Sequence, residues 1–176
     1  SSLTPKNPAF EISQVKLLLA LKEGVIVGRI AGIILDAEKE DKNLARFGWI
    51  DFIDDEKVST ALIQGIIDWA KPFGITGIHG PLGFTDFDFE GTLIEGFDEL
   101  ATQATIYNFP YYASHFESLG FSKACDWLEG RGEVPKELPK RMVRGASLIK
   151  TRFKLEAKKI KIKYQLKPYS KAIFQT

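Results

Sequence analysis

"ARFGWIDFIDDEKVSTALIQGIIDWAKPFG", residues 45 to 74, decides the fold that we predict for this chain. It opens with apolar and aromatic residues, ARFGWIDFI, which are typical of a buried strand. Apolar residues then recur at the spacing of one helix face, which predicts a helix from about 56 to 73: Val58, Leu62, Ile66 and Trp69. Asp54 or Asp55 can cap the start of this helix, and Gly74 is placed to end it. The stretch therefore predicts a sheet with an amphipathic helix on one face.

The segments on either side of this stretch extend the sheet. "VKLLLAL" and "VIVGRIAGIIL" are rich in branched residues and are separated by Lys22-Glu23-Gly24, which predicts an antiparallel hairpin. We predict strands near 15–21, 25–35, 46–53, 75–79 and 121–129, and further helices near 111–120 and 139–153. The expected fold class is α/β of the α+β kind: a twisted, mixed and mainly antiparallel sheet flanked by helices.

Composition narrows the class of protein. A chain of 176 residues with 44% hydrophobic content can bury one sizeable core. A single cysteine, Cys125, excludes an internal disulfide framework and a four-cysteine metal site. The sequence contains no secretory leader pattern and no apolar run near the roughly 18 residues that suggest a membrane span. We therefore expect a cytoplasmic protein with no membrane partner.

Charge divides the chain into an acidic body and a basic tail. Residues 1 to 135 hold 11 Lys or Arg against 21 Asp or Glu, and residues 136 to 176 hold 13 against 2. In the tail, "KKIKIKYQLK" alternates lysine with apolar residues, which favours a half-buried edge strand with a wet lysine face. The alternative is a strip that binds nucleic acid or another anionic surface. We favour the strand and do not expect a nucleic-acid partner.

The acidic stretch "GPLGFTDFDFEGTLIEGFDE", residues 80 to 99, resembles a calcium loop only at its beginning. In a loop that starts at Asp86, Asp88, Glu90 and Gly91 take the third, fifth and sixth places, but the twelfth falls on Phe97 where a bidentate Glu is needed. We predict no metal site. We expect instead an ordered loop over a cleft, with its carboxylates outward and six apolar side chains inward: Phe84, Phe87, Phe89, Leu93, Ile94 and Phe97.

Candidate site residues lie on both sides of this loop. His79 ends a predicted strand and can act as a general base. "IYNFPYYASH" gathers polar tips on aromatic bodies, from which we take Tyr112 and His115 as catalytic candidates. The candidate substrate-binding residues are Asp86, Asp88, Tyr107, Asn108 and Tyr111. One of the two adjacent tyrosines is expected in the core, because Tyr112 and Phe116 lie four residues apart. We also assign Trp49, Trp69 and Trp127 to the core.

The order of elements and several motifs resemble the GNAT-type N-acetyltransferase superfamily. "HFESLGF" at 115 to 121 is similar to the end of a helix in that family. "RFGWIDFIDDE", "GPLGFTD" and "EGFDEL…ATIYNFPYY" together resemble bacterial GNAT-like proteins, common in Bacteroidetes, whose chains carry two such halves. The resemblance implies a GNAT-like domain over residues 1–135 that lacks its first strand and helix. Residues 136–176 would form a helix and the basic strand, as the start of a second half.

The same resemblance argues against a cofactor site in this chain. Active family members hold the pyrophosphate of coenzyme A in a glycine-rich turn at a helix N-terminus. The corresponding turn here, Ile53 to Thr60, has no glycine and carries three carboxylates, and Phe116 stands where the family places a tyrosine acid. We therefore expect no cofactor in this chain, with acetyl-CoA or another acyl-CoA bound elsewhere in the full-length protein. The chain would be a non-catalytic or acceptor-shaping half that faces a small-molecule amine or peptide, or alternatively a binding or scaffold domain.

Overall fold

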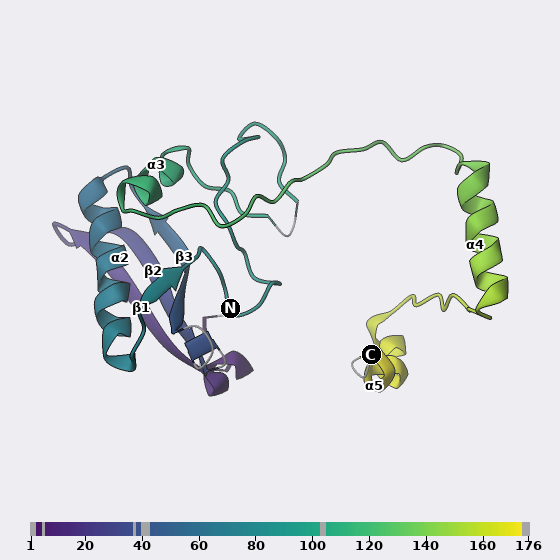
Figure 1. Cartoon of the computed structure of the whole chain (residues 1–176), viewed down its shortest axis with the longest axis horizontal. Helices are drawn as coiled ribbons and strands as arrows, with labels where there is room; N and C mark the ends of the chain where they lie inside the picture. The colour runs from purple at the N-terminus through teal and green to yellow at the C-terminus, as the bar shows by residue number, and fades with distance from the viewer. Residues whose placement is uncertain (1–2, 5, 37, 40–42, 103–104, 174–176) are drawn as a thin grey trace. The chain divides into compact units, whose positions relative to one another are not determined.

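The structure is a computed structural model that describes residues 3–4, 6–36, 38–39, 43–102 and 105–173. The chain divides into two compact units, Ser1–Cys125 and Asp126–Thr176. Figure 1 shows the sheet and the helices α2 and α3 in the first unit, and α4 and α5 in the second.

The sheet of the first unit has four strands in the order β1-β2-β3-β4. β1 (Ser13–Lys22), β2 (Val25–Leu35) and β3 (Leu44–Phe52) are antiparallel, and the short β4 (Gly77–His79) pairs parallel to β3. Glu23 and Gly24 join β1 to β2 with positive φ at both residues, as the tightest hairpin turns require. The mixed, mainly antiparallel sheet with flanking helices confirms the predicted fold class.

Helix α2 (Glu56–Ala70) follows β3 and begins where the sequence predicted. Asp55 is its N-cap, because its carboxylate accepts a hydrogen bond from the amide of Lys57. A 3-10 turn, η2 (Lys71–Phe73), continues the helix to Gly74, whose φ of 80° is the left-handed conformation that glycine adopts without strain. One face of α2 is buried: Val58, Ser59, Leu62, Ile63, Ile66 and Ala70.

The main core forms between α2, the sheet and α3 (Tyr111–Ser118). Phe47 lies at its centre, fully buried against Phe116 and Phe121 with ring centroids 5.7 and 5.3 Å away. α3 ends before Gly120, which has a positive φ, as predicted. Tyr112 is buried in this core, so the expectation that one of the two adjacent tyrosines packs inside is confirmed.

β3 contains a β-bulge, at which its pairing register with β2 shifts. Arg29 pairs with Asp51 and Ala31 with Gly48, so Ile30 on β2 stands opposite both Trp49 and Ile50. Trp49 has a φ of 46°, which is uncommon for a bulky side chain. β4 pairs with β3 only from Leu44 to Arg46, and the chain after β4 continues along the edge through a bond from the Leu82 amide to the Phe47 carbonyl.

The acidic stretch after β4 differs from the predicted loop in which side chains point inward. Phe84 is buried and packs against Trp49, but Phe87, Phe89 and Ile94 are exposed. The reason is local, since the Asp88 carboxylate accepts hydrogen bonds from the amides of Phe84 and Thr85 and so turns toward the backbone. The prediction that the loop buries all six apolar side chains is therefore wrong.

The second unit contains α4 (Lys140–Arg152), the 3-10 helix η3 (Lys163–Tyr169) and the short α5 (Ser170–Ile173). The helix predicted near 139–153 is confirmed. The strand predicted near 121–129 and the basic strand predicted from the lysine alternation are both absent from the described residues. A strand needs a neighbour to receive its backbone hydrogen bonds, and β4, at the sheet edge, is three residues long. Trp127 is exposed, so its assignment to the core is wrong as well.

A substitution at Gly48 tests how closely the chain after β4 approaches β3. A Cβ at this position would lie 2.2 Å from the carbonyl oxygen of Leu82, which is backbone and cannot rotate away. We expect Gly48→Ala to lower the free energy of unfolding by about 1–3 kcal/mol or more. Gly65→Ala in α2 is the control, because its Cβ would meet only the flexible tip of Leu18 and a helix favours alanine. Urea unfolding of both variants is the measurement, and equal stabilities would contradict the close approach.

Candidate functional site

Two tyrosines of α3 complete the backbone hydrogen bonding of β3 at its open edge. The Tyr112 hydroxyl accepts from the amide of Phe52 at 3.2 Å, and the Tyr111 hydroxyl donates to the carbonyl of Phe52 at 2.6 Å. The ring of Tyr112 also stacks on Phe52 with centroids 4.3 Å apart. Both hydroxyls therefore replace a missing neighbour strand at this residue.

Tyr112 also donates its proton to a carboxylate. Its hydroxyl lies 2.8 Å from Oδ1 of Asp51, whose side chain is largely exposed. Burial raises the pKa of Tyr112 well above the usual value, and the bond to Asp51 raises this pKa further. A phenol that holds its proton this firmly is a poor acid for a departing group. The two hydrogen bonds of its hydroxyl hold Tyr112 at the end of β3.

His115 connects α3 to α2 through both of its ring nitrogens. Nδ1 lies 2.8 Å from Oγ of Ser59, which is buried on α2, and Nε2 lies 2.9 Å from Oδ1 of Asp54. Although the His115 side chain is buried, that of Asp54 is 69% exposed. The pair therefore links a buried hydroxyl to a carboxylate in water.

The protons available to Ser59 and His115 limit which atom can donate in each of these hydrogen bonds. A carboxylate only accepts, so Nε2 of His115 carries the proton donated to Asp54. Ser59 has one hydroxyl proton and two acceptors within reach, Nδ1 of His115 and the Glu56 carbonyl at 3.1 Å. If Ser59 donates to Nδ1, His115 is neutral; if Ser59 donates to Glu56, Nδ1 must donate to Ser59 and His115 is a cation. A second hydrogen-bond network joins Tyr111 and Tyr112 to Phe52 and Asp51, and it meets the first through the ring of Tyr111, which lies 5.5 Å from that of His115 between centroids. The residues of both networks are together called the Tyr–His cluster: Asp51, Asp54, Ser59, Tyr111, Tyr112 and His115.

The N-terminus of α2 lies beside this cluster and is occupied by the protein's own carboxylate. Asp55 caps the helix and pairs with Nζ of Lys22 at 3.1 Å. The hydrogen bond from Lys22, followed by that from the Lys57 amide, lowers the pKa of Asp55. Asp54 and Glu56 add negative charge on either side. This helix end is therefore unfavourable for a phosphate group.

His79 belongs to a second group of charged residues, the Glu38 cluster, made of Glu38, Arg46 and His79. Arg46 donates from Nη2 and Nε to the two carboxylate oxygens of Glu38 at 2.7 and 2.9 Å, and from Nη1 to the Gly83 carbonyl. Nε2 of His79 lies 3.3 Å from the same carboxylate. The hydrogen bond from Arg46 holds the pKa of Glu38 below its usual value, against an opposing effect of burial. His79 thus has a carboxylate partner while a third of its side chain stays exposed.

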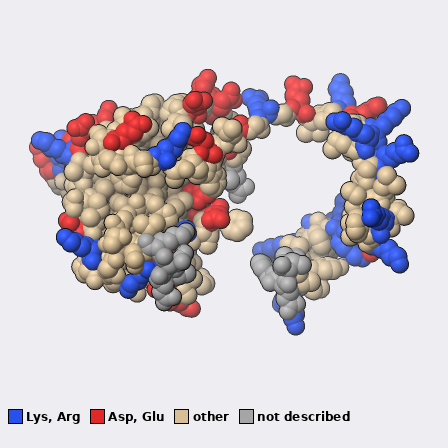
Figure 2. All heavy atoms as spheres, in the orientation of Figure 1, with Lys and Arg blue, Asp and Glu red and all other residues tan. Residues whose placement is uncertain are grey.

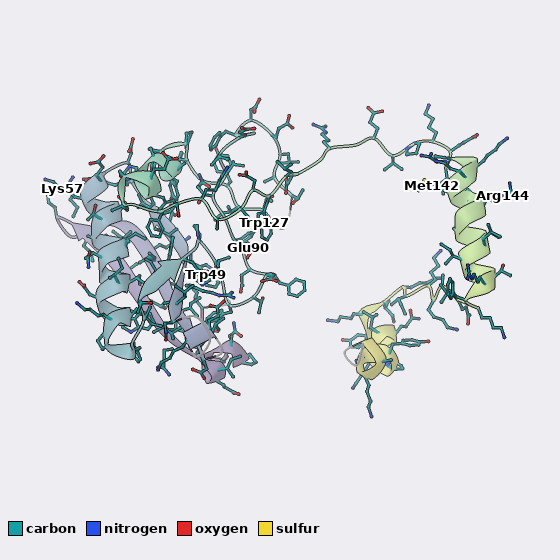
Figure 3. All side chains as sticks on the ribbon, viewed as in Figure 1. Trp49, Lys57, Glu90, Trp127, Met142 and Arg144 are labelled. Carbon is teal, nitrogen blue, oxygen red and sulfur yellow. The ribbon has the colours of Figure 1, made fainter. Side chains whose placement is uncertain are left out.

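Glu90, labelled in Figure 3, lies near this second cluster in an unfavourable setting. Its Oε1 is buried without a hydrogen-bond partner. Burial raises the pKa of Glu90, and the charge of Asp86 raises it further, whereas Arg46 lowers it. Within the described parts of the chain, no group of three or more His, Cys, Asp or Glu side chains is arranged to hold a metal ion.

The candidate residues fall into separate places. Tyr111, Tyr112 and His115 share the Tyr–His cluster, whereas His79 lies in the Glu38 cluster and Asp86 acts on it only through its charge. The Asp88 carboxylate accepts hydrogen bonds from backbone amides of its own turn. Asn108 is buried and bonds the amide and carbonyl of Leu93, which fastens the acidic loop to the segment before α3. Tyr107 is half exposed against Phe97. Among the described residues, no hydrogen bond joins the two clusters.

Four partners of the candidate residues were missed in the sequence: Glu38, Arg46, Asp51 and Ser59. Ser59 could have been identified from the sequence. It lies on the apolar face of the predicted helix next to Val58, where a hydroxyl without a partner would be unfavourable. Glu38 lies 41 positions before His79 in the chain, and no local pattern connects them.

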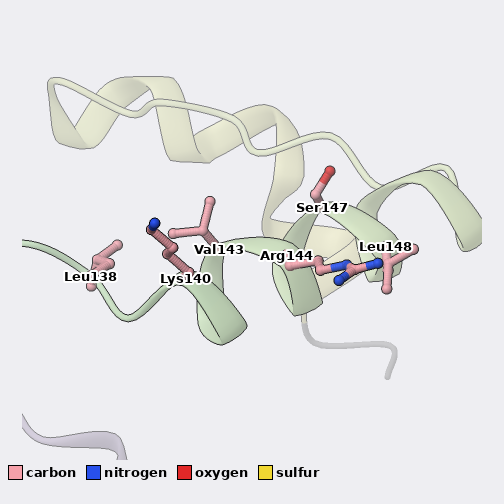
Figure 4. Close-up of a pocket in the computed structure, with 6 residues that line it drawn as sticks. All are labelled: Leu138, Lys140, Val143, Arg144, Ser147 and Leu148. Atoms are coloured by element: carbon pink, nitrogen blue, oxygen red, sulfur yellow. The ribbon is translucent and has the colours of Figure 1, made fainter.

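A shallow groove in the second unit lies on α4 and on the residues just before it (Figure 4). It is lined by Leu138, Lys140, Val143, Arg144, Ser147 and Leu148. All six come from one short segment, and none belongs to either cluster. We therefore do not assign this groove as the candidate site.

Comparison with known proteins finds two similar chains. Protein YghO of Escherichia coli K12 is 38% identical over 128 residues, which cover 72% of this chain and 33% of YghO. A protein of Caulobacter vibrioides named bacterial ceramide synthase is 32% identical over 152 residues, which cover 82% of this chain and 40% of that protein. The chain thus spans a third to two fifths of the length of these relatives. No family model and no solved structure matches the chain.

Tyr112→Phe tests whether the α3 hydroxyls complete the edge of β3. The change leaves the buried Phe52 amide and the Asp51 carboxylate without this partner, so we expect a loss of about 1–3 kcal/mol in unfolding free energy. We also expect faster hydrogen exchange at the Phe52 amide. Tyr107→Phe is the control, because the Tyr107 ring is half exposed and packs only edge-on against its neighbours. Unchanged exchange at Phe52 would show that the hydroxyl is dispensable.

Glu38→Gln and Glu90→Gln should respond to pH in opposite senses. The folded-state pKa of Glu38 is lowered, so its contribution is present above the unfolded pKa and is lost as pH falls through the folded pKa. At pH 7 we expect Glu38→Gln to cost about 1–3 kcal/mol, because the charged partner of Arg46 is lost. The folded-state pKa of Glu90 is raised, so its stabilising contribution exists at low pH and is lost as pH rises. Glu90→Gln should therefore stabilise the protein at pH 7.

Urea unfolding of both variants as a function of pH is the measurement for this pair. Both differences from the parent protein should shrink in acid. Glu117→Gln, at an exposed position of α3, serves as the control. If Glu90→Gln destabilises the protein at pH 7, the charged Glu90 carboxylate is not unfavourable in its buried position, and the prediction is wrong.

Proposed function

We propose that this chain is the acceptor-side part of an acyltransferase-type protein with a GNAT-like fold, and that it shapes a site for an amine. The similarity to a protein named bacterial ceramide synthase supports the reaction class. A ceramide is an amide between a fatty acyl group and the amino group of a long-chain base. A protein that makes one transfers an acyl group to nitrogen, which is the chemistry of the family that the sequence motifs resemble.

The observation that carries the acceptor role is the acidic, self-capped N-terminus of α2. Asp55 occupies the position where a donor phosphate would need free backbone amides, and Asp54 and Glu56 repel further negative charge. The same carboxylates attract a protonated amine. Acyl-CoA would then bind to another part of the full-length protein.

The Tyr–His cluster supplies the groups for such an amine. Asp51 and Asp54 present exposed carboxylates at one end of β3, and the partly exposed ring of Tyr111 lies beside them. An amine must lose a proton before its nitrogen attacks an acyl carbon. The exposed carboxylate of Asp54 is the group at this surface that can take up the proton, while His115 holds this carboxylate through Nε2 and Ser59 holds the ring through Nδ1.

A second candidate function is a binding or scaffold domain without acyl transfer. It is favoured because the polar groups of α3 already have hydrogen-bond partners within the protein. The hydroxyls of Tyr111 and Tyr112 and both nitrogens of His115 have partners within the protein. A domain that only holds its shape would show the same bonds. The two functions differ in whether an amine binds.

Calorimetry at low salt with acetyl-CoA and with octylamine separates the possibilities. We expect acetyl-CoA to bind weakly or not at all, and octylamine to bind with an affinity that falls as salt rises. A low micromolar dissociation constant for acetyl-CoA, on the order of −8 kcal/mol, would contradict the phosphate argument.

Asp51→Asn with Asp54→Asn should weaken octylamine binding. Each carboxylate contributes about 1 kcal/mol near water, which corresponds to roughly fivefold in affinity. Asp98→Asn with Glu117→Gln removes the same charge at exposed positions elsewhere and serves as the matched control. If both double variants bind octylamine as the parent does, or if none binds it, the scaffold function is the better explanation.

A further inference from the structure

Helix α4 carries an apolar stripe that nothing in the described residues covers. The stripe residues follow one another at spacings of four, three and four positions, which places them on one face of the helix: Met142, Ala146, Ile149 and Phe153. Met142, Ile149 and Phe153 are each more than half exposed. No side chain in the described residues 126–172 is buried. The stripe is therefore available to a partner.

Cations border this stripe and also lie on the opposite face of α4, beside exposed Val143 and Leu148. On a helical projection with 100° per residue, Lys150 and Arg152 lie on either side of the stripe, and Lys140 and Arg144 lie opposite it. Met142 and Arg144, labelled in Figure 3, mark the two faces. α4 contains no acidic residue. Its charge is entirely positive.

The segment after α4 continues the same character. Lysines at 158, 159, 161 and 163 alternate with exposed or half-exposed Ile160, Ile162 and Tyr164, and no strand pairs with them in the described residues. The explanation of these lysines as the wet face of an edge strand therefore fails. Figure 2 shows Lys and Arg gathered on the part of the chain that carries α4.

We propose that α4, with the basic segment behind it, binds the surface of an anionic phospholipid bilayer. The stripe of Met142, Ile149 and Phe153 would enter the boundary between headgroups and acyl chains, and the flanking Lys150 and Arg152 would reach the headgroup phosphates. α4 has 13 residues, and no helix among the described residues is both long and apolar enough to cross a bilayer. The helix lies on the membrane and does not span it.

Charge complementarity and the apolar stripe together select this partner over a nucleic acid. Both would attract the cations of residues 136 to 173. A phosphate backbone offers no apolar layer for a continuous row of Met, Ile and Phe side chains, whereas a bilayer does. The nucleic acid is the competing outcome of the test.

Co-sedimentation of the whole chain with lipid vesicles tests the proposal. Vesicles of phosphatidylcholine alone are compared with vesicles of equal parts phosphatidylcholine and phosphatidylglycerol. We expect binding to the anionic vesicles that falls steeply with added salt, and weak binding to the neutral ones. Absence of binding to anionic vesicles, or equal binding to both kinds, would overturn the proposal.

Two variants separate the contributions of charge and of the stripe. Arg144→Gln with Lys150→Gln and Arg152→Gln should lower partitioning onto anionic vesicles roughly a hundredfold, since each cation near the surface contributes about fivefold. Ile149→Ser with Phe153→Ser keeps every cation and should also lower vesicle binding at least tenfold. The matched control is Lys16→Gln with Lys57→Gln and Lys71→Gln, which removes three exposed lysines from the first unit and should leave binding unchanged.

Binding to a duplex RNA, measured in parallel, decides between the two partners. If the serine variant binds vesicles as well as the parent does, and the chain binds duplex RNA more tightly than it binds vesicles, the surface is a nucleic-acid site and the proposal fails. These measurements involve neither octylamine nor the Tyr–His cluster. A failure here is thus distinct from a failure of the proposed acceptor function.

Discussion

The edge of β3 must be completed by groups other than a strand, and much of the first unit follows from this requirement. Buried backbone amides and carbonyls need partners, and β4 supplies them only from Leu44 to Arg46. The Leu82 amide then bonds Phe47, and the hydroxyls of Tyr111 and Tyr112 bond Phe52. The positions of the post-β4 chain and of α3 therefore follow from the shortness of β4. The bulge at Trp49 lies between these two solutions, where β3 changes direction.

This arrangement limits the chemistry that α3 can perform. The hydroxyls of its tyrosines and the ring nitrogens of His115 are engaged in holding β3 and α2, so they serve structure first. What faces water at this end of the sheet is negative charge, on Asp54 and on Asp51, whose Oδ2 also lies 3.9 Å from Nη2 of Arg29. An acidic surface suits an amine and opposes coenzyme A, and this is the physical reason for our proposal that the acceptor binds here and the donor elsewhere.

The second unit differs from the first in the exposure of its apolar side chains. It lacks a buried side chain in its described residues and shows apolar and basic side chains together. Each such apolar side chain loses up to about 1.5–3 kcal/mol by staying in water, which an external apolar layer would recover. We therefore propose different partners for the acidic and basic parts of the chain, an amine for the first unit and an anionic surface for the second.

The sequence by itself determined the features that depend on neighbours along the chain. The β1–β2 hairpin, the span and caps of α2, the end of α3 at Gly120 and the existence of α4 follow from apolar spacing and from turn residues, which act over a few positions. It predicted His115, Tyr111 and Tyr112 as a group because they stand close together in the stretch IYNFPYYASH. Only the tertiary structure decided what depends on pairing between distant segments. The predicted strands near 121–129 and at the basic tail have the right local pattern, but no strand pairs with them in the described residues. Ser59, Asp54 and Glu38 bond their histidines across 41 or more positions because folding brought them within hydrogen-bond distance, and no local pattern encodes such a contact.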